Sequence, residues 1–296
     1  MGIFVLIIIL AHLLADFPFQ TDSMIKDKNK QKVLLIHIFI HYVTSLILVV
    51  ITAVFLKVTS EVYLKLFVCI AIITLLHYIT DFFKERLTLK SNKIRSSYYQ
   101  SIMKAVIYIF DQIVHFILII IISQIIFQEE FDVLNKIINL LTMQDEIKLK
   151  LYTQILMTFV VILLNTYFIG YLLGILLIPF KPSSFITETI TETTLEVAFS
   201  NEKHKDDQIH KTQQKITFIK DSPIKAGMWI GILERNIIIV LCLMNSISSI
   251  GFLIAMKALT RFKQFEDKTF AEYYLIGSMF SIVFAIINGY IIKCIW

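Results

Sequence analysis

The sequence has few charged residues for a chain of 296 residues. Only 17% of its residues are charged, 57% are hydrophobic, and the mean hydropathy is +0.75. Soluble domains contain about 25% charged and about 45–50% apolar residues, so this balance excludes a soluble enzyme. It also excludes a disordered chain, which needs low hydrophobicity.

Cysteine, proline and glycine are also scarce. The three cysteines (Cys69, Cys242 and Cys294) lie in apolar runs and form no CxxC pair, which excludes a disulfide framework and a thiolate metal site. Four prolines and eight glycines are too few for a collagen-like chain. The net charge of +5 is modest and lies mainly in the loops between apolar runs, so it indicates membrane orientation and no nucleic-acid binding.

Long apolar runs fill most of the chain. A helix needs about 20 mostly apolar residues to cross the hydrocarbon core of a bilayer. Six long runs qualify, 226–245 is a seventh, and the shorter run 246–260 is an eighth span or a half-span. The six are 2–19, 34–56, 62–83, 103–127, 152–179 and 270–295. We therefore expect an all-α integral membrane protein, a polytopic bundle of seven to eight transmembrane helices.

The basic residues of the loops predict the orientation of this bundle. With eight spans, alternate loops contain in total 20 and 5 Lys and Arg residues. Because basic loops stay in the cytoplasm, we expect a bacterial inner-membrane protein with both termini on the extracytoplasmic side. The first run is not a cleaved signal peptide, because it lacks a basic start and is interrupted by His12 and Asp16.

One polar segment, 181–225, divides the chain. It is rich in Thr, Glu, Lys and Gln and separates a five-span membrane domain at 1–180 from a three-span region at 226–296. We interpret it as a cytoplasmic linker, with a regulatory or partner-binding loop as the alternative. Its blocks at 185–199 and 209–219 could form short helices, short strands or no regular structure.

Ionisable residues recur inside the first four apolar runs with a spacing of four. The pairs are His12 and Asp16, His37 and His41, His77 and Asp81, and Asp111 and His115. Residues four apart share one helix face. The predicted orientation puts all four pairs near the cytoplasmic face at a similar depth. Because each such residue costs about 2.5–3.5 kcal/mol inside a membrane, this set indicates a functional site.

Five imidazoles and three carboxylates at one depth predict a metal centre. Imidazole nitrogen and carboxylate oxygen bind Zn²⁺, Mn²⁺ and Fe²⁺. Eight ligands are more than one ion uses, so we expect two ions, or one ion with an outer layer of polar residues. The catalytic candidates are the carboxylates of Asp16, Asp81 and Asp111, and a non-ligating Asp or His would be the general base. A proton or ion pathway and hydrogen bonding between helices are the alternatives.

Other polar residues are candidates for binding a headgroup. Lys84 lies three residues after Asp81 and could pair with that carboxylate or hold a phosphate. Gln112 follows Asp111 but points about 100° away, which makes it a weak candidate. In the C-terminal region the charged candidates are Glu234, Arg235, Lys257, Arg261 and Glu272. They could form an Arg–Glu pair across helices or clamp an anionic headgroup.

The motifs of the chain form two groups. The N-terminal motifs, within residues 10–116, are His12 to Gln20, His37 to His41, His77 to Lys84, and Asp111 to His115. The C-terminal motifs, within residues 225–281, are Gly227 to Arg235, Ile250 to Lys257, Arg261 to Phe262, and Glu272 to Gly277. Together they resemble an uncharacterised bacterial family of polytopic membrane proteins, the domain of unknown function numbered three-three-zero-seven. This resemblance supports the site residues and implies no reaction. The His/Asp pattern is also distantly similar to that of membrane-bound metal-dependent hydrolases.

These observations favour a metal-dependent hydrolase of a membrane lipid or lipid-linked substrate. No GxSxG motif offers a serine nucleophile, so water activated by a divalent metal is the simpler route. A site near the cytoplasmic face suits an amphiphile that enters from the inner leaflet. The alternatives are a transporter of protons or divalent metals, a di-iron membrane oxidase, and a non-catalytic membrane scaffold. The sequence does not determine the oligomeric state.

Overall fold

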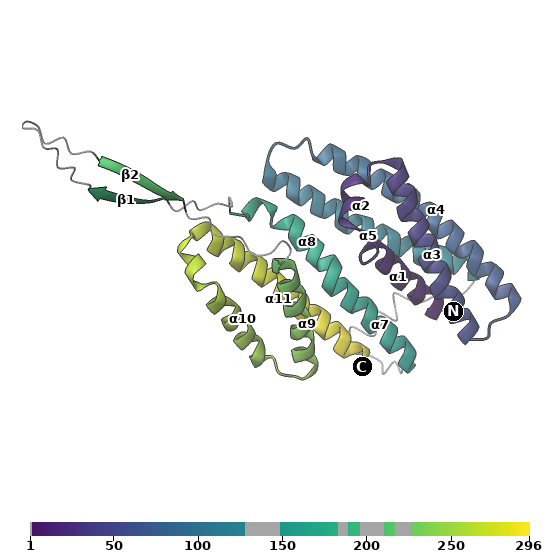
Figure 1. Cartoon of the computed structure of the whole chain (residues 1–296). Helices are drawn as coiled ribbons and strands as arrows, with labels where there is room; N and C mark the ends of the chain where they lie inside the picture. Colours follow the sequence, from purple (N-terminus) through teal and green to yellow (C-terminus); the bar gives the residue numbers. More distant parts are fainter. Residues whose placement is uncertain (1, 128–148, 183–188, 196–209, 217–225) are drawn as a thin grey trace, which may run out of the picture.

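The computed structural model describes residues 2–127, 149–182, 189–195, 210–216 and 226–296. In these residues the chain forms a bundle of long helices and one small β-hairpin (Figure 1). Both termini lie at one end of the bundle, which we call the termini end (Figure 1). The opposite end, where Asp16, Gln31, Ser91 and Ser97 lie, is called the loop end.

Four helices of the N-terminal part form one group. They are α1 (Gly2–Asp16), α3 (Gln31–Phe55), α4 (Ser60–Ser91) and α5 (Ser97–Phe127). Helix α1 packs on α3, α3 on α4, and α4 on α5, and α5 also contacts α1, so the four enclose a common interior. The short helix α2 (Asp22–Asp27) begins where the Thr21 hydroxyl accepts a hydrogen bond from the Met24 amide, and it packs on α3 at the loop end.

A fifth long helix joins this group to the C-terminal helices. It consists of α7 (Leu151–Leu163), the π-helical η1 (Leu164–Phe168) and α8 (Ile169–Leu176), followed by the 3₁₀ turn η2 (Ile178–Phe180). Its first part packs on α1 and its last part on α5, while α11 contacts it from the other side (Figure 1). The C-terminal elements are α9 (Ala226–Leu243), α10 (Ser248–Thr260), η3 (Phe262–Glu266) and α11 (Lys268–Ile295).

Fewer helices reach spanning length than the apolar runs predict. Six described helices are long and apolar enough to cross a membrane. Helices α1 and α10 have 15 and 13 residues, and at 1.5 Å per residue these reach about 22 and 20 Å, short of the 30 Å hydrocarbon core. The count of seven to eight spans is therefore not confirmed. The first run stops early because Pro18 cannot continue an α-helix.

Two predicted polar connections differ from the expectation. Helix α4 continues through Ser91 and α5 begins at Ser97, so most of the expected loop at 84–102 is helical. Lys, Glu and Arg are good helix formers, which explains why the helix outlasts the apolar run. In the linker, β1 (Thr189–Leu195) pairs antiparallel with β2 (His210–Ile216), so the all-α expectation holds for the bundle itself. The rest of the linker lies outside the described residues.

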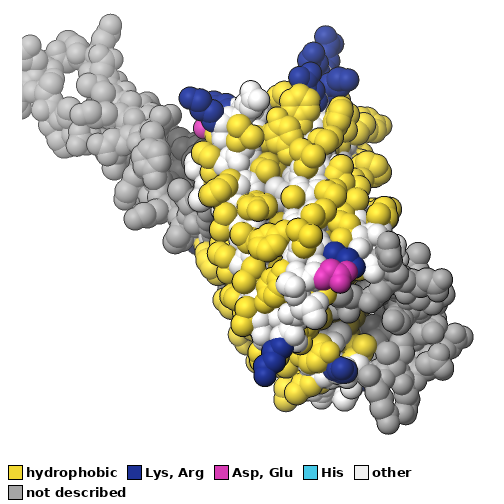
Figure 2. Space-filling model, turned by 90° about the vertical axis from the view of Figure 1, so that its right-hand side faces the viewer, with side chains coloured by type: hydrophobic (Ala, Val, Ile, Leu, Met, Phe, Trp, Pro, Cys, Tyr) yellow, Lys and Arg dark blue, Asp and Glu magenta, His cyan; other side chains and the backbone are white. Residues whose placement is uncertain are grey.

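The outer surface of the bundle is apolar. Large hydrophobic side chains such as Phe39, Leu75 and Phe110 are more than 60% exposed. Figure 2 shows one face covered by hydrophobic side chains, with basic side chains at its upper edge and in its lower part. Soluble proteins rarely expose so large an apolar surface, whereas lipid chains cover it readily. By length, composition and surface, the helices are those of a multi-pass membrane protein.

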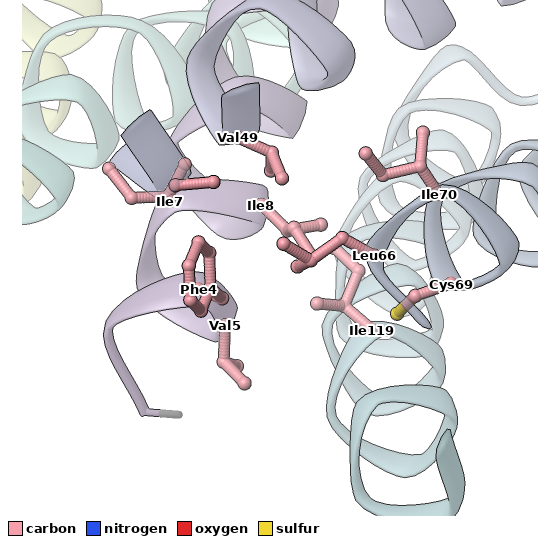
Figure 3. Close-up of a cluster of buried hydrophobic side chains, with 10 residues drawn as sticks. Phe4, Val5, Ile7, Ile8, Val49, Leu66, Cys69, Ile70 and Ile119 are labelled. Carbon is pink, nitrogen blue, oxygen red and sulfur yellow. The ribbon is translucent and has the colours of Figure 1, made fainter. Parts of the chain in front are cut away.

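The half of the four-helix group nearer the termini is filled with hydrocarbon. Side chains from α1, α3, α4 and α5 meet there, and all are nearly inaccessible (Figure 3). They include Phe4, Val5, Ile7, Ile8, Val49, Leu66, Cys69, Ile70 and Ile119. Ser123, which contacts Cys69 Sγ at 3.7 Å, is also buried in this half, whereas the ionisable residues of the described interior lie toward the loop end.

A close helix contact in the C-terminal part gives a stability prediction. A Cβ atom added at Gly289 of α11 would lie 2.8 Å from the Cβ atom of Cys242 in α9. We expect Gly289→Ala to force the two helices apart and lower the free energy of unfolding by about 1–3 kcal/mol. In the matched control Gly251→Ala, where no atom lies within 4 Å, stability should hold or rise because alanine favours helix. Equal thermal unfolding temperatures for the two detergent-purified variants would contradict the close contact.

Candidate metal centre

All eight sequence-predicted ligands converge in the interior of the four-helix group, in the half toward the loop end. Each of them is at most 6% exposed. Each pair faces inward because its two residues lie one turn apart on one helix face. The structure thus brings together His12, Asp16, His37, His41, His77, Asp81, Asp111 and His115.

A first group of ligand atoms surrounds the Asp16 carboxylate at the end of α1. Its Oδ1 atom lies 3.1 Å from Nε2 of His37, 3.1 Å from Nε2 of His41 and 3.9 Å from Nε2 of His77. One ligand atom from each of these four residues lies within 4.8 Å of the others. Three imidazole nitrogens and one carboxylate oxygen form a set that divalent transition metals bind.

A second group lies beside the first on α4 and α5. It consists of His77, Asp81 and His115, whose ligand atoms also lie within 4.8 Å of one another. His77 belongs to both groups, and its ring centroid is 3.9 Å from that of His41 and 4.1 Å from that of His115. The two groups are therefore contiguous and suit either two neighbouring ions or one ion with an outer layer of polar residues.

Several polar atoms of the centre have no hydrogen-bond partner among the described residues. They are Nε2 of His77, Nδ1 of His115 and Oδ1 of Asp81. A buried polar atom left unpaired costs about 1–3 kcal/mol, so a cluster of them calls for a ligand. These atoms are the nitrogen and oxygen types that a divalent cation uses, so the donor set fits a metal ion.

Two lysines neutralise part of the negative charge. Lys28, directly after α2, places Nζ 2.8 Å from Oδ2 of Asp81. In the sequence its loop had served only to predict which side of the membrane the loops face. Lys84 places Nζ 2.6 Å from Oδ2 of Asp111 and 4.0 Å from Oδ1 of Asp81. Its main partner is therefore on the neighbouring helix, and the expected pairing with Asp81 is only secondary.

Side-chain amides and a hydroxyl complete the network. Gln112 donates from Nε2 to Oδ2 of Asp16 at 2.7 Å, so the expectation that it points away from the cluster was wrong. The expectation failed because α5 contacts both α1 and α4, and two faces of α5 therefore point into the interior. Thr80, which the sequence did not single out, lies with Oγ1 2.7 Å from Nε2 of His115. No periodic signal marks Thr80, because threonine is common in apolar helices.

The C-terminal charges lie apart from this centre. Glu234 accepts a hydrogen bond from Lys257 at 2.6 Å, so its partner across helices is a lysine and not the arginine that we expected. Arg261 contacts Gln264 at 3.0 Å, and Glu272 is an exposed partner of Lys268 at 3.8 Å. None of these contacts between described residues reaches the His/Asp centre, because α7 and α8 lie between α11 and the four-helix group.

Arg235 is buried in α9 and donates hydrogen bonds to the backbone of the π-helical segment. A π-helix disturbs the regular backbone ladder and leaves carbonyl groups open for other donors. Arg235 donates from Nε to the Asn165 carbonyl at 2.8 Å and from Nη2 to the Thr166 carbonyl at 3.0 Å. A Cβ atom added at Gly170 would lie 3.1 Å from Nη2, so the missing side chain there leaves room for the guanidinium.

Comparison with known proteins gives one match. The sequence model of a family described as "Protein of unknown function (DUF3307)" matches residues 3–142. No curated protein and no solved structure matches the chain. The matched residues include helices α1 to α5 and all eight residues of the His/Asp centre. Residues 3–142 are therefore similar to the DUF3307 family of proteins of unknown function.

Proposed function

We propose that this chain is an inner-membrane enzyme that uses one or two divalent metal ions to hydrolyse a lipid or a lipid-linked substrate. The observation that carries the proposal is the buried His/Asp centre, in which ligand atoms lie within 4.8 Å of one another. Zinc, manganese and iron all suit such nitrogen and oxygen ligands.

The residues divide between holding the metal and moving a proton. His37, His41, His77 and Asp16 would hold one ion, and His77 with Asp81 and His115 a second. When bound, a divalent ion makes water a nucleophile at neutral pH and polarises a phosphoryl or acyl oxygen. Outside both groups, Asp111 is the carboxylate that accepts the proton as general base.

The surroundings of Asp111 suit this role. Lys84 orients its carboxylate through Oδ2, and the other oxygen, Oδ1, lies 3.6 Å from Nδ1 of His115. Gln112 also donates to Oδ2, at 3.3 Å. The carboxylate is therefore held beside the second ligand group, where a proton from water or a leaving group would be taken up or returned.

The apolar half of the bundle favours an enzyme over a transporter. An ion pathway needs polar groups along the whole membrane depth. In the described part of the four-helix group, Ile8, Val49, Leu66 and Ile119 fill the interior between the centre and the termini end (Figure 3). In this part of the chain no row of ionisable groups leads from the centre to the termini end, which suits hydrolysis at one leaflet.

The orientation of the chain completes the proposal. The loop end carries α2 and the loops richest in Lys and Arg, so we place it in the cytoplasm and both termini outside. The six charged residues proposed for a headgroup, Lys84 and five in the C-terminal region, then fall into two groups. Lys84 lies at the centre. Arg235 is buried against the π-helical segment, so only Glu234, Lys257, Arg261 and Glu272 are left to contact the headgroup of a substrate that extends past α8.

Turnover by the purified, metal-loaded chain in nanodiscs tests this function. We expect the protein to cleave at least one member of a panel of phospholipids and polyprenyl phosphates. Mass spectrometry would identify the products. Asp111→Asn should keep the metal and lower the rate by about 10²–10⁴-fold, the usual contribution of a general base. The control is Glu61→Gln, which removes a surface carboxylate at the termini end of the same bundle and should leave the rate unchanged.

Two results would count against the hydrolase. One is wild-type protein with stoichiometric metal that leaves the whole panel intact. The other is equal turnover by the wild type and by Asp111→Asn. A visible absorption spectrum of a di-iron centre together with substrate oxidation would replace hydrolysis by oxidation, and metal flux into proteoliposomes would replace it by transport.

A further inference from the structure

A groove of about 500 Å³ opens on the surface of the bundle between α4 and α5. On its α4 side lie Leu87 and, just beyond the helix, Ile94, and on its α5 side lie Met103, Val106 and Phe110. These apolar side chains border the lipid-facing surface, since Leu87, Val106 and Phe110 are 48–63% exposed. A cavity of this size falls within the range of 300–1,000 Å³ that small-molecule ligands use.

The groove and the His/Asp centre share a wall. Thr80, Lys84 and Asp111 line the deep end of the groove. The same three residues contact the centre, Thr80 and Asp111 through His115 and Lys84 through the two carboxylates. A molecule lying in the groove would therefore end beside the ligand groups without crossing the apolar core.

The charges of the groove are arranged for an anion near the loop end. Its lining carries two lysines, Lys84 and Lys90, and one acid, Asp111. Lys84 already pairs with Asp111 at 2.6 Å, which leaves Lys90 without an ion pair among the described residues. Lys90 lies near the loop end of α4, and from there to Thr80 the helix rises by about 15 Å. This places a cation at the interface and hydrocarbon toward the membrane interior.

We propose that this groove binds an anionic membrane lipid, with the headgroup at Lys90 and Lys84 and one hydrocarbon chain along Val106 and Phe110. It would deliver the substrate of the proposed hydrolase, so the assignment of this lipid as a substrate rests on that function. A lipid is favoured because the groove opens to the bilayer, is lined mainly by hydrocarbon, and has its free cation at the height of lipid headgroups.

Lipid binding to the detergent-purified full chain tests the groove directly. Native mass spectrometry would measure the affinity for phosphatidylglycerol and for phosphatidylcholine with the same acyl chains. Val106→Trp fills the groove, and we expect it to weaken phosphatidylglycerol binding by about tenfold, since that corresponds to the burial of only about two methylene groups. Lys90→Gln should reduce the preference for phosphatidylglycerol by about fivefold, the effect of one basic residue at an anionic surface.

The matched control is Ile113→Trp on the same helix. Ile113 is 48% exposed and does not line the groove, so the new indole should face lipid and leave the affinity unchanged. Equal lipid affinity of Val106→Trp and Ile113→Trp would overturn the proposal. So would loss of a co-purified polypeptide from Val106→Trp with unchanged lipid affinity, which would make the groove a protein-docking face.

Metal content measured on the same samples separates the two proposals. If Val106→Trp weakens phosphatidylglycerol binding and Ile113→Trp does not, while the wild type binds no metal, the groove proposal is supported and the hydrolase proposal fails. If Val106→Trp and Ile113→Trp bind lipid equally while the metal is stoichiometric, the groove proposal fails and the metal centre stands.

Discussion

Replacing His77 with alanine should remove all bound divalent metal, because among the described residues His77 alone belongs to both ligand groups. His41→Ala should affect only the group around Asp16, and His115→Ala only the group around Asp81. Even residues that merely support a metal ligand change metal affinity by about 10–100-fold, so loss of a shared ligand should exceed that range. The wild type should bind two ions if both groups are used.

Metal titration of the detergent-purified variants, followed by elemental analysis after dialysis, gives the measurement. The control is Ser45→Ala, which changes a buried polar residue one turn from His41 on the same helix and should leave the metal content unchanged. Wild-type metal content in His77→Ala of verified fold would contradict the shared role. A single ion in the wild type that His115→Ala leaves in place would assign His115 to the outer layer.

Asp81→Asn should destabilise the metal-free protein strongly, because it leaves the Lys28 ammonium buried without its carboxylate. The pair is 2.8 Å apart and both side chains are at most 6% exposed. Removing one partner of a buried ion pair costs about 3–5 kcal/mol, largely through the charge left behind. Replacing both residues, as in Asp81→Asn with Lys28→Met, should therefore cost less than the sum of the two single changes.

A double-mutant cycle in the presence of a chelator measures this coupling. Unfolding of the two single variants and the double variant in detergent gives the interaction free energy, which we expect to favour the pair by about 1–3 kcal/mol. The control is the exposed pair of Lys30 and Asp27, 2.9 Å apart, whose coupling should stay below about 1 kcal/mol. Additive effects of Asp81→Asn and Lys28→Met would show that the buried contact does not stabilise the fold.

Hydropathy locates the long helices of the bundle but not where each one ends, and it misses the short helix α2. The apolar run at 2–19 predicts a span, yet α1 stops at Asp16 because Pro18 removes a backbone donor. The run at 62–83 predicts a helix that ends at the first charges, yet α4 continues to Ser91 because those charged residues favour helix. Span length depends on these local preferences as well as on apolar composition.

The His/Asp centre could be predicted from the sequence because residue spacing and helix direction are local properties. Four pairs at i and i+4, each in a run of known direction, suffice to place eight side chains at one depth. The contacts of Lys28 and Gln112 depend on how α2 folds back and on which helices flank α5, and no sequence periodicity encodes either. The partners of Arg235 depend on a π-helix at Leu164–Phe168, and the hydrophobic pattern does not predict this π-helix.

Elemental analysis of the detergent-purified wild type beside a His37→Ala/His41→Ala double variant tests the central claim most directly. Both residues contact Asp16 at 3.1 Å, so their loss removes two of the four ligands of the first group. We expect zinc, manganese or iron at one to two ions per wild-type chain and a loss of at least one of them from a double variant of verified fold. The absence of stoichiometric metal from the wild type, even after reloading, would contradict a metal centre and leave the buried histidines and aspartates as a proton relay or as packing.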